Sequence, residues 1–256
     1  MTKHAIPTPI TLPADVDVQP SLSLVQPATP KVPEHVRYTP ALNLITKRVQ
    51  YAIREGVPLV LVVGEHGCGK STAARLLAQK PRTFYWEARP DYTPKDVMAD
   101  ILEKLNIRVG ESWRQRTDVL TRYLQDHPHT LLIDESQRMG WRTLDQLKYV
   151  ADNSGITIVL LGSPWLEQII AKRTDIDSRV GVRVRVEPLS QADFLRLYSD
   201  DDYPEKVLVA VHEVTRGVYR VIDRLLRHLD VGLADASMSR ADLTPAHVRA
   251  VAQEVL

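Results

Sequence analysis

The sequence predicts an α/β fold in which helices cover both faces of a parallel sheet. Between residues 38 and 189, short apolar runs alternate with segments of helical periodicity, and the first run ends in a glycine-rich turn. Such alternation is typical of strand–helix–strand crossovers, which bring helices to both faces of a sheet. Residues 190–256 show helical periodicity only. We therefore expect an α/β core at 38–189 followed by a small helical lid at 190–256.

Five segments carry the signatures of strands. The first, LVLVV at 59–63, is an uninterrupted apolar run, which predicts a buried parallel strand. The last, VRVRV at 182–186, alternates strictly, which predicts an edge or one-sided strand. The strands are expected at residues 59–63, 83–87, 130–134, 156–161 and 182–186.

Helices are expected between the strands and throughout the lid. Thr93 before Pro94 is a favourable helix start, and Ser190 and Thr244 are further cap positions, because a hydroxyl there accepts a hydrogen bond from the first turn. The core helices are expected at 41–55, 71–79, from 94, 112–125, 142–153 and 165–172. The lid helices are expected at 190–198, 204–215, 218–234 and 244–255.

Residues 1–37 contain seven of the 17 prolines. Prolines at this density block helices and remove hydrogen-bond donors from strands. The sequence therefore predicts an extended, Pro-rich arm. This arm is either a tail without a role or a segment that docks on a partner through its scattered Leu and Val residues.

Composition excludes several classes of protein. Hydrophobic residues make up 44% and charged residues 25% of the 256 residues, so the chain is not wholly disordered. No uncharged stretch reaches the ~18 residues of a membrane span, and the N-terminus lacks the pattern of a secretory signal. Together with the single cysteine, this predicts a cytoplasmic protein without a membrane partner. Because the net charge is only +1, nucleic-acid binding would require a local basic patch.

Residues 64–71 read GEHGCGKS and fit the phosphate-loop pattern G-x-x-x-x-G-K-[ST] between a strand and a helix. Glycines let successive backbone N–H groups turn toward phosphate oxygens, and the positive end of the following helix points to the same place. We expect Lys70 to reach the β- and γ-phosphates of ATP, Ser71 to ligate Mg²⁺ and Thr72 to lie beside the α-phosphate. The predicted nucleotide-binding residues of this loop are Gly64, Glu65, His66, Gly67, Cys68, Gly69, Lys70, Ser71 and Thr72.

His66 and Cys68 occupy variable positions of the motif. We interpret each as a residue that fills a variable position of the loop and takes no part in the chemistry. The alternative for Cys68 is a reactive thiol whose pKa is lowered by the helix N-terminus.

An apolar strand ending in two acids, LLIDE at 131–135, follows the phosphate loop along the chain. In a phosphate-loop protein, Asp134 is expected to hold Mg²⁺ directly or through water, and Glu135 to polarise the attacking water. This pair predicts hydrolysis of ATP rather than transfer of phosphate to a small acceptor. The alternative is an acidic helix start that complements the helix dipole.

Two polar positions are weaker signals for the same site. Ser163 follows the predicted strand at 156–161, and it either contacts the γ-phosphate or the attacking water, or caps the next helix. Arg220 opens a lid helix, from which it is expected to lean onto the phosphates and to report the position of the lid.

The basic segment before the last strand is a possible source of an arginine that acts on a neighbouring subunit. An arginine placed there can stabilise the charge that develops on the neighbour's nucleotide during hydrolysis. Arg179 is the first choice for this role and Arg173 the second. The alternative is a surface salt bridge with Asp175 or Asp177.

The order of these features resembles the AAA+ ATPases, and within them the transposition regulators of the TnsC, TniB and phage Mu B type. The similarity spans roughly residues 40 to 235. The quoted motifs are IDESQ at 133–137, ITIVLLGS at 156–163, Arg179 ahead of 184–188, and TRGVYRVIDR at 215–224.

The resemblance implies a fold, a partner set and a cycle. It implies a P-loop AAA+ core that binds ATP and Mg²⁺, assembles into helical or ring-shaped oligomers on double-stranded DNA, and links a target-selection factor to a transposase. ATP hydrolysis would then disassemble the oligomer. Two departures matter: Ser163 stands where many AAA+ proteins have Asn or Thr, and the Pro-rich arm replaces the helix-turn-helix domain of phage Mu B.

DNA contact would then come from the core itself. Between residues 104 and 116, four basic residues face a single acid, and backbone contacts by Lys and Arg are blind to sequence. The resemblance implies that the element after the second strand touches the DNA backbone; the alternative is a solvated connection between two helices. The predicted DNA-binding residues are Lys95, Lys104, Arg108, Ser112, Arg114 and Arg116.

Other functional classes remain open at this point. A helicase loader or a secretion-associated ATPase would carry the same nucleotide motifs. A nucleotide-dependent assembly scaffold with little turnover is a further alternative, although the intact Lys70, Asp134 and Glu135 argue against it.

Overall fold

The computed structural model of the protein describes residues 30–32, 36–90, 92–107 and 112–256. Most of the predicted Pro-rich arm therefore lies outside the described residues, and so does Arg108, one of the predicted DNA-binding residues.

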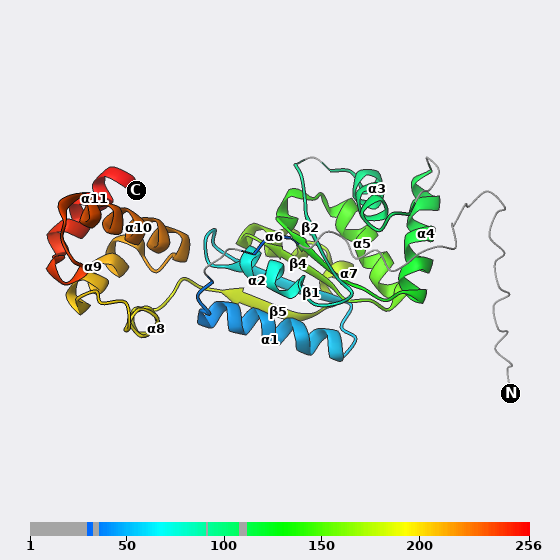
Figure 1. Ribbon diagram of the computed structural model, residues 1–256. Coiled ribbons are helices and arrows are strands. Elements are labelled where there is room, and N and C mark those ends of the chain that lie inside the picture. The colour runs from blue at the N-terminus through cyan, green and yellow to red at the C-terminus, as the bar shows by residue number, and fades with distance from the viewer. Residues whose placement is uncertain (1–29, 33–35, 91, 108–111) are drawn as a thin grey trace, which may run out of the picture.

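The sheet has five parallel strands in the order β2-β3-β4-β1-β5 (Figure 1). This confirms the predicted α/β class. The strands are β1 (Leu59–Gly64), β2 (Thr83–Glu87), β3 (Thr130–Asp134), β4 (Ile158–Gly162) and β5 (Val180–Val186). Every residue of β1, β3 and β4 is buried, whereas β5 alternates between buried Val and exposed Arg side chains at the sheet edge. The one-sided edge strand predicted from the alternation is thus confirmed.

Helices pack on both faces of the sheet because successive side chains of each strand point to opposite faces. One face carries α1 (Pro40–Arg54) and α2 (Lys70–Leu77) over a cluster that includes Val60, Val62 and Leu132. The other face carries α3 to α7 over a larger cluster that includes Leu61, Trp86 and Ile133. These helices are α3 (Pro94–Lys104), α4 (Trp113–Asp126), α5 (Trp141–Ser154), α6 (Pro164–Ala171) and α7 (Thr174–Asp177).

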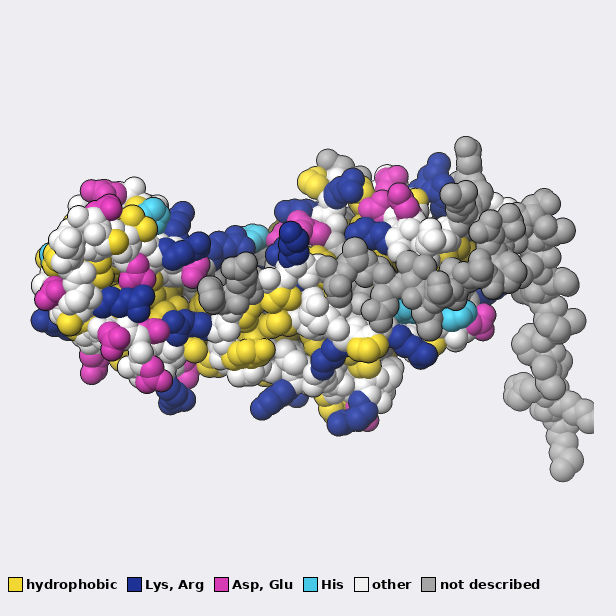
Figure 2. Space-filling model, in the orientation of Figure 1, with side chains coloured by type: hydrophobic (Ala, Val, Ile, Leu, Met, Phe, Trp, Pro, Cys, Tyr) yellow, Lys and Arg dark blue, Asp and Glu magenta, His cyan; other side chains and the backbone are white. Residues whose placement is uncertain are grey.

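The C-terminal residues form a helical lid with a hydrophobic cluster of its own. Its elements are α8 (Gln191–Leu197), α9 (Glu205–Thr215), α10 (Tyr219–Ala236), the 3₁₀ turn η2 (Arg240–Asp242) and α11 (Pro245–Val255). Figure 1 shows the lid beyond one end of the sheet, near the start of α1. In Figure 2, Lys and Arg side chains lie along the margin of the lid that faces the core.

Local signals placed the helix starts well. Thr93, Ser190 and Thr244 each accept a hydrogen bond from a backbone N–H of the first turn, as predicted. The short helix α7 and the 3₁₀ turns η1 (Ser136–Arg138) and η2 were not predicted, because a single turn is too short to show periodicity.

Candidate nucleotide-binding site

The loop between β1 and α2 has the backbone geometry that the phosphate-loop motif requires. Gly67 and Gly69 adopt φ angles of +85° and +94°, in the left-handed region that side chains disfavour. Gly69 is the N-cap of α2, so the helix points its free N–H groups toward the loop. These groups can bind an anion without any side chain.

A cavity of about 260 Å³ opens beside this loop, between the core and the lid. Four parts of the chain line it: the segment before α1 with the start of that helix, the phosphate loop with the start of α2, Glu135 after β3, and the start of α10. The structure therefore brings together many of the predicted nucleotide-site residues. Those lining the cavity are His66, Gly67, Gly69, Lys70, Ser71, Thr72, Glu135 and Arg220.

Lys70 is nearly buried in this cavity, with 8% of its surface exposed. Its Nζ donates hydrogen bonds to the backbone carbonyls of Gly64 at 2.6 Å and Glu65 at 2.8 Å. Burial lowers the pKa of the ammonium group, against the attraction of nearby groups that include Asp134 and Glu135. Phosphate oxygens are stronger acceptors than these carbonyls, so a bound triphosphate can take over the ammonium donors.

Cys68 belongs to the loop, but only 4% of its surface is exposed. Burial raises the pKa of its thiol, and the attraction of Lys70 opposes this only in part. The alternative of a reactive thiol with a lowered pKa is therefore wrong. The interpretation of Cys68 as filling agrees with its place in the cluster below α1 and α2.

Asp134 ends β3 with 2% of its surface exposed. Its Oδ1 accepts the backbone N–H of Glu135 at 2.9 Å, and its Oδ2 accepts the hydroxyl of Tyr85 at 3.0 Å. Burial and the Asp134 charge raise the pKa of Tyr85, which remains a neutral donor. Sequence reasoning missed Tyr85, because only the pairing of β2 with β3 brings it to this carboxylate.

Glu135 follows with its backbone in the left-handed region, at a φ of +54°. Its Oε2 accepts a hydrogen bond from Nε2 of Gln137 at 2.7 Å and lies 3.5 Å from a guanidinium nitrogen of Arg138. The carboxylate thus sits at the cavity with two neighbours that the sequence motif did not mark as functional.

Ser163 and Arg220 differ in how they relate to the cavity. Ser163 is the N-cap of α6, but its side chain makes no capping hydrogen bond; its N–H donates to Oε1 of Gln137 at 3.1 Å. Ser163 does not line the cavity. Arg220 does line it, and its backbone N–H donates to the carbonyl of Gly67 at 3.1 Å. The lid therefore touches the phosphate loop directly at Arg220.

The two arginines considered for a role between subunits have different surroundings. Arg179 donates from Nε to both oxygens of Asp152, each at 3.0 Å. This is a surface salt bridge, although with neither of the two partners that the sequence suggested. Arg173 instead stacks on Trp141 at 3.8 Å from the ring centroid, and within the described residues it forms no ion pair. Neither arginine lines the cavity of its own chain.

The predicted DNA-binding residues divide between two places. Hydrogen bonds from Thr93 lower the pKa of Asp96, and Lys95 and Arg116 add smaller electrostatic contributions, so both lie near the start of α3. Lys104 is at the other end of α3, about 14 Å along the helix axis from Lys95. Ser112 and Arg114 are exposed at the start of α4.

Oxygen donors are available for the predicted Mg²⁺. Ser71 lines the cavity and contributes a hydroxyl, and Asp134 contributes a carboxylate at the end of β3. In the described part of the chain, no group of three or more His, Cys, Asp or Glu side chains could hold a metal ion. Mg²⁺ commonly takes one or two protein ligands and completes its shell with phosphate and water.

The described helices were also compared with the length of a bilayer. None of them combines the length and the apolar character needed to cross a membrane.

Comparison with known proteins agrees with this geometry. Residues 53–170 match the family model described as an AAA domain. The fold resembles the ORC2 protein of Aeropyrum pernix, with a TM-score of 0.64, 15% identity and coverage of 88% of this chain and 70% of that one. It also resembles CDC6P of Pyrobaculum aerophilum, with a TM-score of 0.68, 16% identity and coverage of 90% and 70%.

Two curated relatives match in sequence. General secretion pathway protein A of Aeromonas hydrophila is 24% identical over 203 residues, which cover 68% of this chain and 37% of that protein. A potential ATP-binding protein of Staphylococcus aureus is 21% identical over 140 residues, which cover 45% of this chain and 51% of that protein. This chain thus matches about half or less of the length of either relative.

The sheet order, the phosphate loop and the match at residues 53–170 together define the class of fold. The chain has the parallel α/β fold of a phosphate-loop protein, and its middle part is similar to the AAA domain.

Proposed function

We propose that this protein is an ATP-dependent regulator of DNA transposition that assembles as a helical or ring-shaped oligomer on double-stranded DNA. In this proposal it is cytoplasmic, links a target-selection factor to a transposase, and disassembles when ATP is hydrolysed. The single observation that carries the oligomeric part is Arg173, an arginine whose guanidinium lies over the Trp141 ring and does not line the nucleotide cavity of its own chain.

The hydrolytic step follows from the residues around the cavity. Loop N–H groups and Lys70 bind the phosphates and offset their charge. Glu135 accepts the proton of the attacking water and so increases its nucleophilicity. Ser71 and Asp134 would hold Mg²⁺, which supplies charge neutralisation at the β- and γ-phosphate oxygens.

Arg173 rather than Arg179 is then the arginine supplied to the neighbouring subunit. Arg179 is bound by Asp152 through both carboxylate oxygens, so Arg179 could reach a neighbouring subunit only if this salt bridge were broken. A guanidinium stacked on an indole keeps its N–H donors available at the edge of the stack. The structure thus favours the second choice of the sequence reasoning over the first.

We predict that Arg173→Ala lowers ATPase activity of the assembled protein by about 10³-fold, the scale of an arginine finger, while Arg179→Ala has a much smaller effect. Mixing Arg173→Ala subunits with Glu135→Gln subunits, each nearly inactive alone, should restore activity at shared sites. A larger loss for Arg179→Ala, or no recovery on mixing, would contradict this assignment.

DNA binding is supported by the basic residues at the start of α3 and α4 and by one structural neighbour. The ORC1 protein of Aeropyrum pernix was solved in complex with DNA. This chain resembles it with a TM-score of 0.62 and 17% identity, and the match covers 86% of this chain. In our proposal Lys95, Arg114 and Arg116 contact phosphates, so binding weakens with salt and ignores base sequence. Lys104 makes a separate contact at the far end of α3.

The proposal is tested by negative-stain imaging of the protein with double-stranded DNA, with a non-hydrolysable ATP analogue and without nucleotide. We expect filaments or rings on DNA only with the analogue, and their loss after ATP replaces it. Particles that stay small and ignore DNA would contradict the proposal.

A secretion-associated ATPase is the second candidate, because General secretion pathway protein A matches 68% of this chain. That candidate, like a helicase loader, predicts nucleotide-dependent assembly with a protein partner and without DNA. The same images therefore separate it from the transposition regulator. Assembly with ATP but without measurable turnover would instead favour a scaffold.

A further inference from the structure

We propose that Gln137 is a positioning residue for Glu135, and that its side chain ties the catalytic carboxylate to the end of β4. This inference rests on the proposed ATPase function. It concerns the last residue of the IDESQ motif at 133–137, to which the sequence analysis assigned no role.

The side-chain amide of Gln137 connects the residue that follows β3 with the residue that follows β4. Its Nε2 donates to Oε2 of Glu135 at 2.7 Å, and its Oε1 accepts the backbone N–H of Ser163 at 3.1 Å. One end of the amide therefore holds the carboxylate that follows β3, and the other end holds the residue that follows β4. A primary amide is the group that can do both at once, because it is donor and acceptor.

The surrounding backbone is shaped to admit this amide. A Cβ atom on Gly162 would meet Oε1 of Gln137 at 2.5 Å, so any larger residue there would displace the bridge. Gln137 itself lies in η1, which is anchored by Ser136, a fully buried residue whose hydroxyl donates to the carbonyl of Ile133 at 2.8 Å. The absence of a side chain at Gly162 thus leaves room for the Gln137 amide, and buried Ser136 fixes the backbone from which the Gln137 side chain extends.

The neighbouring Arg138 cannot substitute for the amide. Its guanidinium is 3.5 Å from Glu135, and it also donates to Glu87 at 3.2 Å and to the carbonyl of Ala88 at 3.0 Å. Arg138 is therefore shared among three acceptors. The shorter contact from Gln137 is the one that sets the direction of the Glu135 carboxylate toward the cavity.

This arrangement has a kinetic consequence. A general base works only within hydrogen-bond reach of the water that it activates, and a displacement of about 1 Å can cost about 10²-fold in rate. Gln137 does not line the nucleotide cavity, so its loss should spare nucleotide binding. Its effect should fall on kcat alone.

The test compares Gln137→Met, which keeps the size but removes both hydrogen bonds, with wild type under assembling conditions. We expect kcat to fall at least about tenfold, with the KM for ATP and the melting temperature unchanged. Gln137→Glu, which keeps an acceptor for Ser163 but has no donor for Glu135, should lose as much. Gln253→Met, on the exposed side of α11, is the matched control and should keep wild-type activity.

A double-mutant cycle separates positioning from a structural role. Glu135→Gln alone should lower kcat by about 10²- to 10⁴-fold, and adding Gln137→Met to it should change kcat less than twofold. Losses that multiply in the double variant, or a raised KM for ATP in Gln137→Met alone, would overturn the inference for Gln137. Undiminished turnover in Glu135→Gln, or no turnover in wild type, would overturn the proposed function and this inference together.

Discussion

The two walls of the nucleotide cavity are built in different ways. The phosphate loop is shaped by its own backbone: positive φ angles at Gly67 and Gly69 and the N-terminus of α2 fix it locally. The lid wall is placed by a few polar contacts with distant residues. Arg220 donates its backbone N–H to the carbonyl of Gly67 in the loop.

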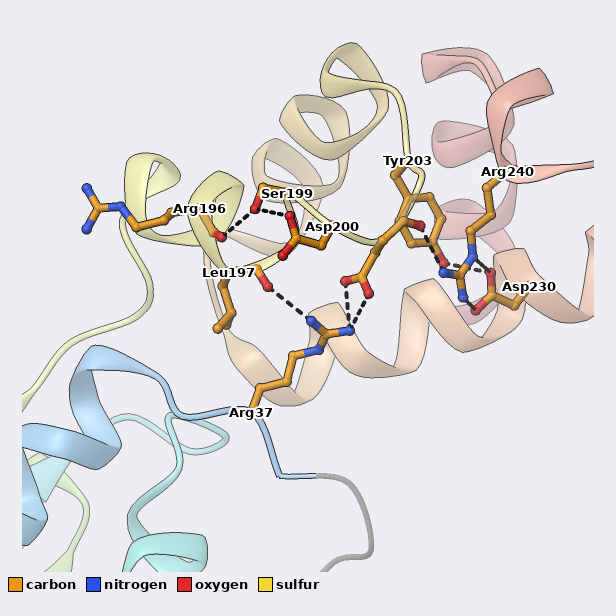
Figure 3. Close-up of polar contacts among 9 residues, drawn as sticks. Arg37, Arg196, Leu197, Ser199, Asp200, Tyr203, Asp230 and Arg240 are labelled. Carbon is orange, nitrogen blue, oxygen red and sulfur yellow. Dashed lines mark hydrogen bonds and ion pairs between the residues drawn. The ribbon is translucent and has the colours of Figure 1, made fainter.

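Arg37 makes a second connection to the lid (Figure 3). It lies just before α1 and lines the cavity, and its guanidinium donates to the carbonyl of Leu197 at 3.0 Å and to Asp201 at 2.9 Å. The same group stacks over Tyr198 at 4.2 Å. The comparison of the two walls shows that the groups available to bind phosphate lie in the loop. The position of the lid over the cavity depends instead on individual contacts, which can be removed one at a time.

The largest expected effect is on the loop wall. Lys70→Ala should weaken ATP binding by on the order of 100-fold or more, because it removes a charged donor to two phosphates. DNA-dependent assembly should disappear with it. Calorimetric titration with ATP measures the affinity, and Lys80→Ala, an exposed lysine after α2, is the control. Assembly without measurable ATP binding would break the link between the loop and the oligomer.

A smaller effect is expected on the lid wall. Arg37→Ala should weaken ATP binding by about 3- to 10-fold, since the lost contacts are partly exposed and hold the lid rather than the phosphates. Hydrogen exchange of residues 191–201 should increase at the same time. The control is Arg54→Ala, whose exposed side chain pairs with its neighbour Glu55 and makes no contact with the lid that the structure describes. Tighter or unchanged binding would show that this contact does not place the lid.

The smallest effect concerns the interior of the lid. Arg240 donates to both oxygens of Asp230, from Nε at 2.9 Å and Nη2 at 2.7 Å, and stacks over Tyr203 (Figure 3). Burial raises the pKa of Asp230, but hydrogen bonds from Arg240 and Tyr203 outweigh it and leave the pKa lowered. A carboxyl with a lowered folded-state pKa contributes stability above its unfolded value of about 3.9, and the contribution is lost as pH falls through the folded value.

Arg240→Met should therefore lower the free energy of unfolding by about 1 kcal/mol at neutral pH, a modest value because both side chains are more than one third exposed. The difference from wild type should shrink below about pH 3. Urea unfolding at both pH values measures it. An equal difference at both pH values would attribute the loss to packing on Tyr203 instead.

Sequence reasoning predicted the fold and the loop because their signals are local. The parallel α/β class follows from the alternation of strand and helix signals, and the loop conformation follows from glycines within one turn. The different surroundings of Arg179 and Arg173 were not predictable in this way. Arg179 and Arg173 lie in the same basic segment, and what separates them is Asp152 beside one and Trp141 beside the other.

The sequence by itself therefore determined the α/β class, the phosphate loop and the pair Asp134 and Glu135, because each is a contiguous pattern whose geometry the backbone imposes. Only the tertiary structure decided that Tyr85 holds Asp134, that Gln137 holds Glu135 against the end of β4, and that Arg37 reaches the lid. Tyr85 is 49 residues from its partner, and Arg37 is 160 residues from Leu197. Contacts over such separations depend on how helices and strands pack, and no local pattern of residues encodes that packing.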